Sequence, residues 1–227
     1  MMESVLIAAV SAVQAYLLGS IDTGILVSKF LYHDDVRKYG SGAAGMTNML
    51  RTFGKKAAAL TAFGDVLKGV LAVCIGRWLF TLMPESTTLS PYLAVYLAAI
   101  FAIIGHLKPL YFGFKGGKGI AATAGLILAI HPAFIPMGVI LFFGTFLLTH
   151  YVSLGSLLVY AGFLIEMVIM GQMDLFSMPV GHRSEMYVIA AFLTAMAYWK
   201  HRENIKRLLS GTERKTYLFK KNKEALN

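Results

Sequence analysis

The sequence is poor in charge, and it contains a single cysteine. Cys74 alone can form neither an internal disulfide nor a cysteine-based metal cluster. Only 15% of the 227 residues are charged, and 57% are hydrophobic, whereas soluble domains carry about 25% charged and about 45–50% apolar residues. The mean hydropathy of +0.64 indicates more apolar surface than a soluble core of this size could bury. This composition excludes an ordinary soluble domain and predicts an all-α, polytopic integral membrane protein.

Acidic residues are scarce as well, with 12 Asp and Glu against 21 Lys and Arg, a formal net charge of +9. Such a balance suits either nucleic acid or a membrane surface that carries anionic lipids. The long apolar runs favour membrane lipid, and we expect no nucleic-acid partner. The five aspartates that a metal-dependent phosphotransferase would draw on are spread along the chain as Asp22, Asp34, Asp35, Asp65 and Asp174. Because that chemistry usually needs clustered carboxylates, we expect no metal site.

Seven apolar runs divide the chain. They cover residues 5–30, 57–83, 91–111, 120–130, 133–148, 152–170 and 185–199. A helix needs roughly 20 residues to cross a bilayer, so the fourth run is expected to be short or only partly inserted. We therefore predict about seven transmembrane helices in a single domain, residues 1–227, with a basic tail at 200–227.

The distribution of basic residues predicts the orientation. If the loop at 32–56 is cytoplasmic, seven spans place the loop at 113–119 and the C-terminal tail on the same side. All Lys and Arg except Arg77 and Arg183 then lie on that side or at its edge. We expect the N-terminus outside and the C-terminus in the cytoplasm.

Residues 113–119, read as Gly-Phe-Lys-Gly-Gly-Lys-Gly, form the most distinctive stretch. Glycines let backbone N–H groups converge on one point, lysines add positive charge, and a helix that begins at Ile120 would add the positive end of its dipole. The spacing is not that of a Walker A motif, so a nucleoside triphosphate site is disfavoured. The stretch predicts a site for a smaller phosphate ligand, against the plainer interpretation of a basic turn that touches anionic lipid.

Three further stretches could carry chemistry. In residues 39–51, Ser41 offers a hydroxyl, and a helix after Gly45 would align Thr47, Asn48 and Arg51 on one face. A plainer interpretation remains open for each stretch. Residues 39–51 could be a flexible loop, the stretch inside a span could hold an ion pair that only neutralises itself, and the stretch in the tail could be a basic membrane anchor.

The other two stretches lie within or next to apolar runs. Asp65 and Lys68 sit three residues apart inside a span, where ionisable groups often mark function, and His106 lies near the end of the next span. In the tail, His201 and Asn204 share a helical face, and the histidine could act as acid or base.

Together and in this order, these stretches resemble the acyl-phosphate:glycerol-3-phosphate acyltransferase family of bacterial inner membranes. The resemblance rests on Gly-Ser-Gly at 40–42, Thr-Asn at 47–48, Gly-Asp-Val-Leu-Lys-Gly at 64–69, Gly-His at 105–106, Phe-Lys-Gly-Gly-Lys-Gly at 114–119, His-Arg-Glu-Asn-Ile at 201–205 and Gly-Thr-Glu at 211–213. It covers essentially the whole chain.

The resemblance implies seven membrane helices with the active site facing the cytoplasm. It also implies transfer of a fatty acyl group from acyl phosphate to the sn-1 hydroxyl of glycerol 3-phosphate, without a cofactor. The products are 1-acylglycerol 3-phosphate and phosphate. Catalytic positions carried over by resemblance are Ser41, Arg51, Lys118, His201 and Asn204. Expected substrate-binding positions are Gly42, Thr47, Asn48, Asp65, Lys68, His106, Lys115, Gly116, Gly117 and Gly119.

Glu213 matches a structurally important glutamate of that family. Membrane lipid and the enzyme that forms the acyl phosphate are the further expected partners. Two alternatives stay open, a small transporter of anionic solutes and a paralogue of the acyltransferase with altered substrate. Ala43 and Met46 stand where the family usually has asparagine and alanine, which leaves the second alternative standing.

Overall fold

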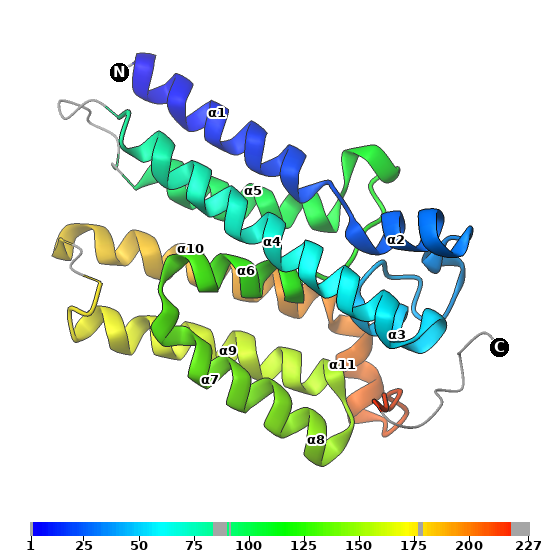
Figure 1. Ribbon diagram of the computed structural model, residues 1–227. Helices are drawn as coiled ribbons and strands as arrows, with labels where there is room; N and C mark the ends of the chain where they lie inside the picture. The colour runs from blue at the N-terminus through cyan, green and yellow to red at the C-terminus, as the bar shows by residue number, and fades with distance from the viewer. Residues whose placement is uncertain (1, 84–89, 91, 177–178, 219–227) are drawn as a thin grey trace. The chain divides into compact units, whose positions relative to one another are not determined.

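The computed structural model describes residues 2–83, 90, 92–176 and 179–218 of the chain, and within them all regular secondary structure is helical (Figure 1). The helices are α1 (Met2–Gly19), α2 (Thr23–Tyr32), η1 (Val36–Lys38), α3 (Met46–Phe53), α4 (Lys55–Phe80), α5 (Leu93–Leu107), η2 (Leu110–Phe112), α6 (Ile120–Ile130), η3 (Pro132–Phe134), α7 (Ile135–Val139), η4 (Ile140–Gly144), α8 (Thr145–Thr149), α9 (Val152–Gln172), α10 (Val180–Lys200) and α11 (Arg202–Leu209). The predicted all-α class is confirmed.

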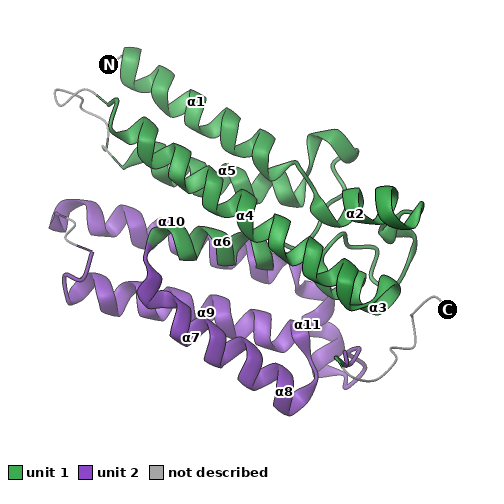
Figure 2. Cartoon of the chain, in the orientation of Figure 1, with its two compact units in different colours: residues 1–130, 218–227 green, residues 131–217 purple. Residues whose placement is uncertain are grey.

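The chain divides into two compact units, shown in different colours in Figure 2. The first unit holds residues Met1–Ile130 and Leu218–Asn227, and the second holds His131–Tyr217. Composition and patterning predicted a single domain, and this stays a prediction. Each unit is described by itself below.

In the first unit, α4 packs against α1, α5 and α6, and α1 packs along α5. The pairing of α1 with α5 is close because glycine faces backbone at the contact. A Cβ on Gly19 would lie 2.1 Å from the Ala102 carbonyl oxygen, and one on Gly105 would lie 2.3 Å from the Tyr16 carbonyl oxygen. Ser11 Oγ donates to the Ala94 carbonyl oxygen at 2.5 Å in the same contact. Small residues therefore set the close spacing at the end of α5 that carries His106.

The first predicted span, residues 5–30, is interrupted in the structure. The helix α1 ends at Gly19 and α2 begins at Thr23, with Asp22 as the N-cap between them. Asp22 Oδ1 accepts the Ile25 N–H at 3.1 Å, which satisfies one of the N–H groups that every helix start leaves unpaired. An acidic residue inside an apolar run thus starts a second helix.

In the second unit, η3, α7, η4 and α8 follow one another, and η4 is a turn of π-helix. This helical run and α10 both pack against α9, and α11 contacts α9 and α10. A Cβ on Gly155 of α9 would lie 3.0 Å from the Phe142 carbonyl oxygen, so α9 approaches the π-helical turn closely.

Five stretches are long and apolar enough to cross a membrane, namely Met2–Tyr32, Lys55–Phe80, Leu93–Phe112, Pro132–Thr149 and Val152–Gln172. Two of the seven predicted runs are not among them. The helix α6 has 11 residues, which rise about 16 Å and fall short of a bilayer core. The helix α10 has 21 residues, but His182, Arg183 and Glu185 make its first half polar.

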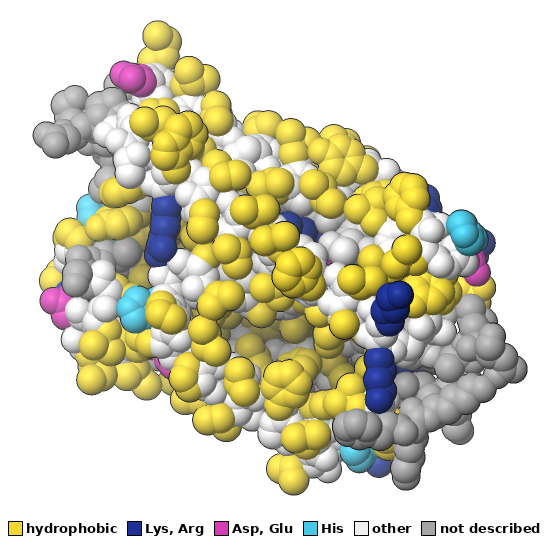
Figure 3. All heavy atoms as spheres, viewed as in Figure 1, with side chains coloured by type: hydrophobic (Ala, Val, Ile, Leu, Met, Phe, Trp, Pro, Cys, Tyr) yellow, Lys and Arg dark blue, Asp and Glu magenta, His cyan; other side chains and the backbone are white. Residues whose placement is uncertain are grey.

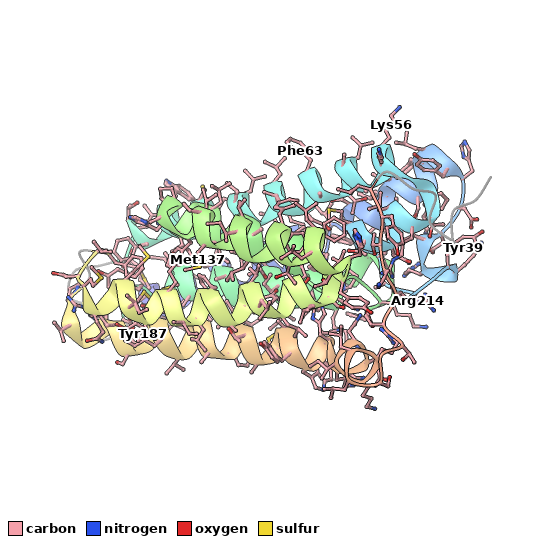
Figure 4. The ribbon with its side chains drawn as sticks, turned by 90° about the horizontal axis from the view of Figure 1, so that it is seen from below. Tyr39, Lys56, Phe63, Met137, Tyr187 and Arg214 are labelled. Carbon is pink, nitrogen blue, oxygen red and sulfur yellow. The ribbon has the colours of Figure 1, made fainter. Side chains whose placement is uncertain are left out.

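Large apolar side chains cover much of the face drawn in Figure 3. On α4, Phe63 is 70% exposed, and Figure 4 shows it with Lys56 on the outer side of that helix. Helices that present such side chains outward are typical of proteins surrounded by lipid.

Candidate active site

Asn48 organises the loop that precedes α3. Its Nδ2 donates to the carbonyl oxygens of Val36, Tyr39 and Ala43 at 3.0–3.1 Å, and its Oδ1 accepts the Ser41 N–H at 3.4 Å. The side chain is only 3% exposed. Asn48 was predicted to bind substrate, but its side-chain amide is hydrogen-bonded to the backbone of this loop.

The other predicted residues of this stretch differ in exposure. Ser41 and Gly42 are exposed, Thr47 is half-buried, and Arg51 is 7% exposed within α3. Beneath them lies a small apolar core of Ile25, Val36, Ala44, Met49 and Ala57. Ser41 Oγ accepts the Ala43 N–H at 3.4 Å, so the hydroxyl sits in a turn on the surface of a fixed loop.

The glycine-lysine loop, residues 113–119, lies against the C-terminal end of α5. A Cβ on Gly116 would lie 2.1 Å from the His106 carbonyl oxygen, and one on Gly117 would lie 2.3 Å from His106 Nε2. The same Cβ on Gly117 would be 3.4 Å from the Ala44 carbonyl oxygen, so the loop before α3 adjoins this loop. The structure thus brings together two stretches that are some 70 residues apart in the sequence.

The backbone of this loop offers N–H donors. Gly117 and Gly119 are buried, and no group in the described part of the chain accepts their N–H or that of Gly116. Gly119 has φ +92°, a conformation that glycine adopts readily, and α6 begins at the next residue. Buried N–H groups without acceptors, the start of a helix and the ammonium of Lys118 make this loop suited to an anion.

Asp65, Lys68 and His106 form a buried cluster, and all three are at most 5% exposed. Lys68 Nζ lies 2.7 Å from Asp65 Oδ1, 2.8 Å from His106 Nδ1 and 2.9 Å from the Ile21 carbonyl oxygen. Because an ammonium group only donates, Nδ1 accepts and the ring proton sits on Nε2, the atom that faces Gly117. These three predicted substrate-binding residues bind one another beneath the glycine-lysine loop.

His201, Asn204 and Glu213 lie in the second unit and are at most 8% exposed. His201 ends α10, and its Nδ1 lies 2.8 Å from the Ala197 carbonyl oxygen. Since a carbonyl only accepts, Nδ1 carries the proton, and Nε2 is the basic nitrogen of the neutral ring. Asn204 Nδ2 donates to Glu213 Oε1 at 2.7 Å.

The sequence matches a known family over most of its length. Residues 9–211 match the family Glycerol-3-phosphate acyltransferase. The chain is 45% identical over 204 residues to the glycerol-3-phosphate acyltransferase of Clostridioides difficile (strain 630), covering 90% of this chain and 93% of that protein. It is 41% identical over 207 residues to that of Mycoplasmopsis synoviae (strain 53), covering 88% and 90%.

This chain belongs to the glycerol-3-phosphate acyltransferase family. Its fold is similar to the crystal structure of PlsY (YgiH), an integral membrane glycerol 3-phosphate acyltransferase, in the glycerol 3-phosphate form. The TM-score is 0.79 and the identity 33%, over 94% of this chain and 99% of that one. The lysophosphatidic acid form of PlsY matches with a TM-score of 0.75 and 30% identity, over 93% and 96%. The chain is therefore a multi-pass membrane acyltransferase.

Glu213 of this acyltransferase joins the helices α9 and α11 of the second unit. Its carboxylate accepts from Ser153 of α9 at 2.9 Å and from Arg207 of α11 at 2.8 Å, besides Asn204. Burial would raise the pKa of Glu213, but the hydrogen bonds from Asn204, Arg207 and Ser153 outweigh it and lower the pKa below the ordinary value of 4.5. The structural role that the resemblance implied for Glu213 stays a prediction.

Sequence reasoning about the acyltransferase missed two residues that touch this machinery. Asp22 was named only among the scattered aspartates, yet it caps α2 next to the Ile21 carbonyl oxygen that Lys68 binds. Arg37 was counted only as a basic residue, yet its Nη1 donates to the Phe112 carbonyl oxygen at 2.7 Å, directly before the glycine-lysine loop. The one available signal for Arg37 was its place two residues after Asp35 in a loop already singled out.

A surface hollow of about 480 Å³ lies at the end of α2 and is lined by Lys29, His33, Asp34, Asp35 and Lys38. None of the predicted site residues lines it. Hydrogen bonds from Tyr39 and Lys38 lower the pKa of Asp34 to about 2, so its carboxylate is charged at neutral pH. The sequence predicts chemistry instead at the glycine-lysine loop.

Proposed function

We propose that this acyltransferase uses acyl phosphate as its donor and transfers the acyl group to the sn-1 hydroxyl of glycerol 3-phosphate. The products are 1-acylglycerol 3-phosphate and inorganic phosphate. The observation that carries the proposal is the pair of buried N–H groups of Gly117 and Gly119, which have no acceptor among the described residues, beside Lys118. Both substrates carry a phosphate that such donors would bind. The forms in which PlsY was crystallised, with glycerol 3-phosphate and with lysophosphatidic acid, support the choice of acceptor and product.

In this proposal the first unit binds phosphate. Lys118 supplies the main charge at the glycine-lysine loop, and Gly116, Gly117 and Gly119 supply directed N–H donors. Arg51 adds a planar guanidinium from α3. Such preorganised donors bind an anion without the cost of reorganising at the moment of reaction.

We assign the acceptor chemistry to His201 and Asn204. The Nδ1 hydrogen bond to Ala197 fixes the His201 ring with Nε2 as its basic atom, which can orient the glycerol hydroxyl or take its proton. Glu213 fixes Asn204 through the 2.7 Å hydrogen bond. A His201→Gln variant should lose most of its turnover and still bind glycerol 3-phosphate.

The acyl group passes directly from donor to acceptor in this proposal. The hydroxyl oxygen of glycerol 3-phosphate forms a bond to the acyl carbon, the bond from that carbon to the phosphate oxygen breaks, and the hydroxyl proton goes to His201 or to the departing phosphate. A mixed anhydride already has a good leaving group, so positioning supplies a large share of the rate.

The rival mechanism makes Ser41 a covalent nucleophile, which requires a neighbouring base. Ser41 Oγ instead accepts the Ala43 N–H at 3.4 Å in the surface turn. Brief incubation with radiolabelled acyl phosphate, acid quenching and peptide mapping would decide between the two routes. Label recovered on Ser41 would overturn direct transfer, and Ser41→Ala gives the matched blank.

We further propose seven membrane helices in a bacterial inner membrane, with the N-terminus outside and the catalytic residues facing the cytoplasm. The support is the concentration of Lys and Arg in the loops that carry the site residues. Cysteines introduced singly, as Lys56→Cys and Glu203→Cys in a Cys74→Ser background, should be protected from an impermeant thiol reagent in intact cells. Labelling of either from outside would reverse the orientation.

We also propose that the two units work as one acyltransferase domain, since the family match runs from residue 9 to residue 211 and so covers both. The enzyme that forms acyl phosphate is the proposed protein partner, because a mixed anhydride hydrolyses in water and is best handed over directly.

The central experiment incubates purified protein with palmitoyl phosphate and labelled glycerol 3-phosphate. We expect labelled 1-acylglycerol 3-phosphate and an equal amount of inorganic phosphate. Parallel reactions use acyl-CoA or acyl-loaded acyl carrier protein as the donor. Formation of product with either of these, but not with acyl phosphate, would contradict the assignment of acyl phosphate as the donor. Release of phosphate without acylation of glycerol 3-phosphate would instead indicate a paralogue with another acceptor.

A further inference from the structure

Arg37 is fixed in place before it reaches the glycine-lysine loop. Its Nη2 and Nε lie 2.7 Å and 2.9 Å from the two carboxylate oxygens of Asp35, and Asp35 Oδ1 also accepts the Arg37 N–H at 3.0 Å. Such a two-point pairing holds both the charge and the plane of the guanidinium. Hydrogen bonding to Arg37 lowers the pKa of Asp35, so the pair stays ionised at neutral pH.

The remaining edge of the guanidinium faces the loop backbone. Arg37 Nη1 donates to the Phe112 carbonyl oxygen at 2.7 Å and to the Lys115 carbonyl oxygen at 3.3 Å. These two residues lie on either side of Gly113 and Phe114, whose φ angles are +67° and +58°. A non-glycine residue with positive φ persists only where its surroundings hold it, and Arg37 holds both ends of this turn.

The bond to Lys115 also fixes the direction of the next N–H. In a trans peptide the carbonyl and the following N–H point opposite ways, and no peptide bond among the described residues is cis. Because the Lys115 carbonyl oxygen points at Arg37, the Gly116 N–H points away from it. Gly116 is the first of the three glycines whose N–H groups have no acceptor among the described residues.

We propose that Arg37, oriented by Asp35, is a positioning residue that sets the N–H groups of the glycine-lysine loop for the substrate phosphate; this rests on the function proposed above. Arg37 acts through the backbone and does not bind the phosphate itself. Its Nε, Nη1 and Nη2 are all engaged by Asp35 or by loop carbonyls. Its charge is balanced by Asp35, so its contribution is mainly geometric.

The chain supplies a matched control one residue away. Lys38 Nζ pairs with Asp34 Oδ1 at 2.9 Å in the same turn, at 69% side-chain exposure, and Lys38 forms no side-chain hydrogen bond or ion pair with the described residues 112–119. Replacing Lys38 by Gln removes one positive charge from the same surface and leaves the loop untouched. The variants to compare are Arg37→Ala, Arg37→Lys, Asp35→Asn and Lys38→Gln in the full chain.

Two measurements test the proposal. Steady-state kinetics should show the KM of a phosphate-bearing substrate raised at least about tenfold in Arg37→Ala, with a smaller change in kcat, because the lost geometry weakens phosphate binding. Arg37→Lys should recover little, since an ammonium cannot make the two-point pair with Asp35. Low millimolar guanidinium should restore part of the Arg37→Ala activity, and Lys38→Gln should behave like the wild type.

The second measurement needs no turnover. Inorganic phosphate should raise the melting temperature of the wild type and of Lys38→Gln, and the rise should be lost in Arg37→Ala and in Arg37→Lys. If the wild type makes no lysophosphatidate, the proposed function fails, but this phosphate shift still tests Arg37. The proposal would be overturned if Arg37→Ala kept the wild-type KM values and the full rise in melting temperature with phosphate. If the alanine variant does not fold, the same KM and melting measurements on Arg37→Lys decide the question.

Discussion

Gly117→Ala is the sharpest test of how the glycine-lysine loop is held. The new Cβ would lie 2.3 Å from His106 Nε2 and 2.7 Å from His106 Cε1, whereas ordinary contacts begin at 3.4 Å. Relief therefore requires a movement of about 1 Å, the difference between these distances. The ring cannot supply it cheaply, because His106 is 2% exposed and its Nδ1 is bound to Lys68 at 2.8 Å.

The loop must then move, and its N–H groups move with it. A misplacement of about 1 Å in a positioned site can cost on the order of 100-fold in rate, while overpacking costs about 1–3 kcal/mol of stability. We expect kcat/KM of Gly117→Ala to fall by roughly 100-fold in protein that still purifies as a folded species.

Gly138→Ala is the matched control, because a Cβ there meets nothing within 4 Å. Initial rates of lysophosphatidate formation and thermal melting in detergent should be measured for both variants. Wild-type kinetics in Gly117→Ala would refute the claim that His106 supports the loop from beneath.

Three further substitutions test separate contacts. Lys68→Met leaves Asp65 buried without the ammonium that lies 2.7 Å from it, so thermal and denaturant melts should show the free energy of unfolding lowered by about 3–5 kcal/mol. The double variant Asp65→Asn/Lys68→Met should recover part of this stability. No recovery would contradict the pairing. Asn48→Ala removes the hydrogen bonds to Val36, Tyr39 and Ala43. Trypsin should then cleave the loosened loop faster, after Arg37 or Lys38. An unchanged cleavage rate would argue against Asn48 as the residue that holds this loop. Glu213→Gln should lower the melting temperature relative to the wild type. This difference should hold above pH 4.5 and close as the pH falls below it, because the lowered pKa of Glu213 contributes stability only while the carboxylate is ionised. A difference in melting temperature that is independent of pH would contradict this account.

The stretches that carry chemistry could be recognised from the sequence because they depend on local residue types. Glycine and lysine at 113–119 stand out against apolar surroundings, and their interpretation as a phosphate loop needs only the freedom of glycine and the charge of lysine. The short helix at 120–130 was likewise predicted at its observed bounds, since His131 and Pro132 end the apolar run. The membrane class followed from composition alone.

Other features depended on contacts between residues far apart in the chain. Arg37 and Phe112 are 75 residues apart, and Lys68 and His106 are 38 residues apart. No local sequence pattern therefore predicts either hydrogen bond. The break in the first predicted span at Asp22 was missed for a related reason. A run of apolar residues measures length and hydrophobicity, but not where a side chain will cap a new helix.

By itself, the sequence determined that this is a helical membrane protein, because hydrophobicity acts locally. From glycine and charge it also predicted a phosphate-binding loop. The tertiary structure decided which of the predicted residues are exposed and which are bound to other parts of the chain. Asn48 and the cluster of Asp65, Lys68 and His106 are turned inward by packing, and Arg37 is held against loop backbone. The physical reason is that a polar group withdrawn from water must find a partner, and folding alone selects which partner is within reach.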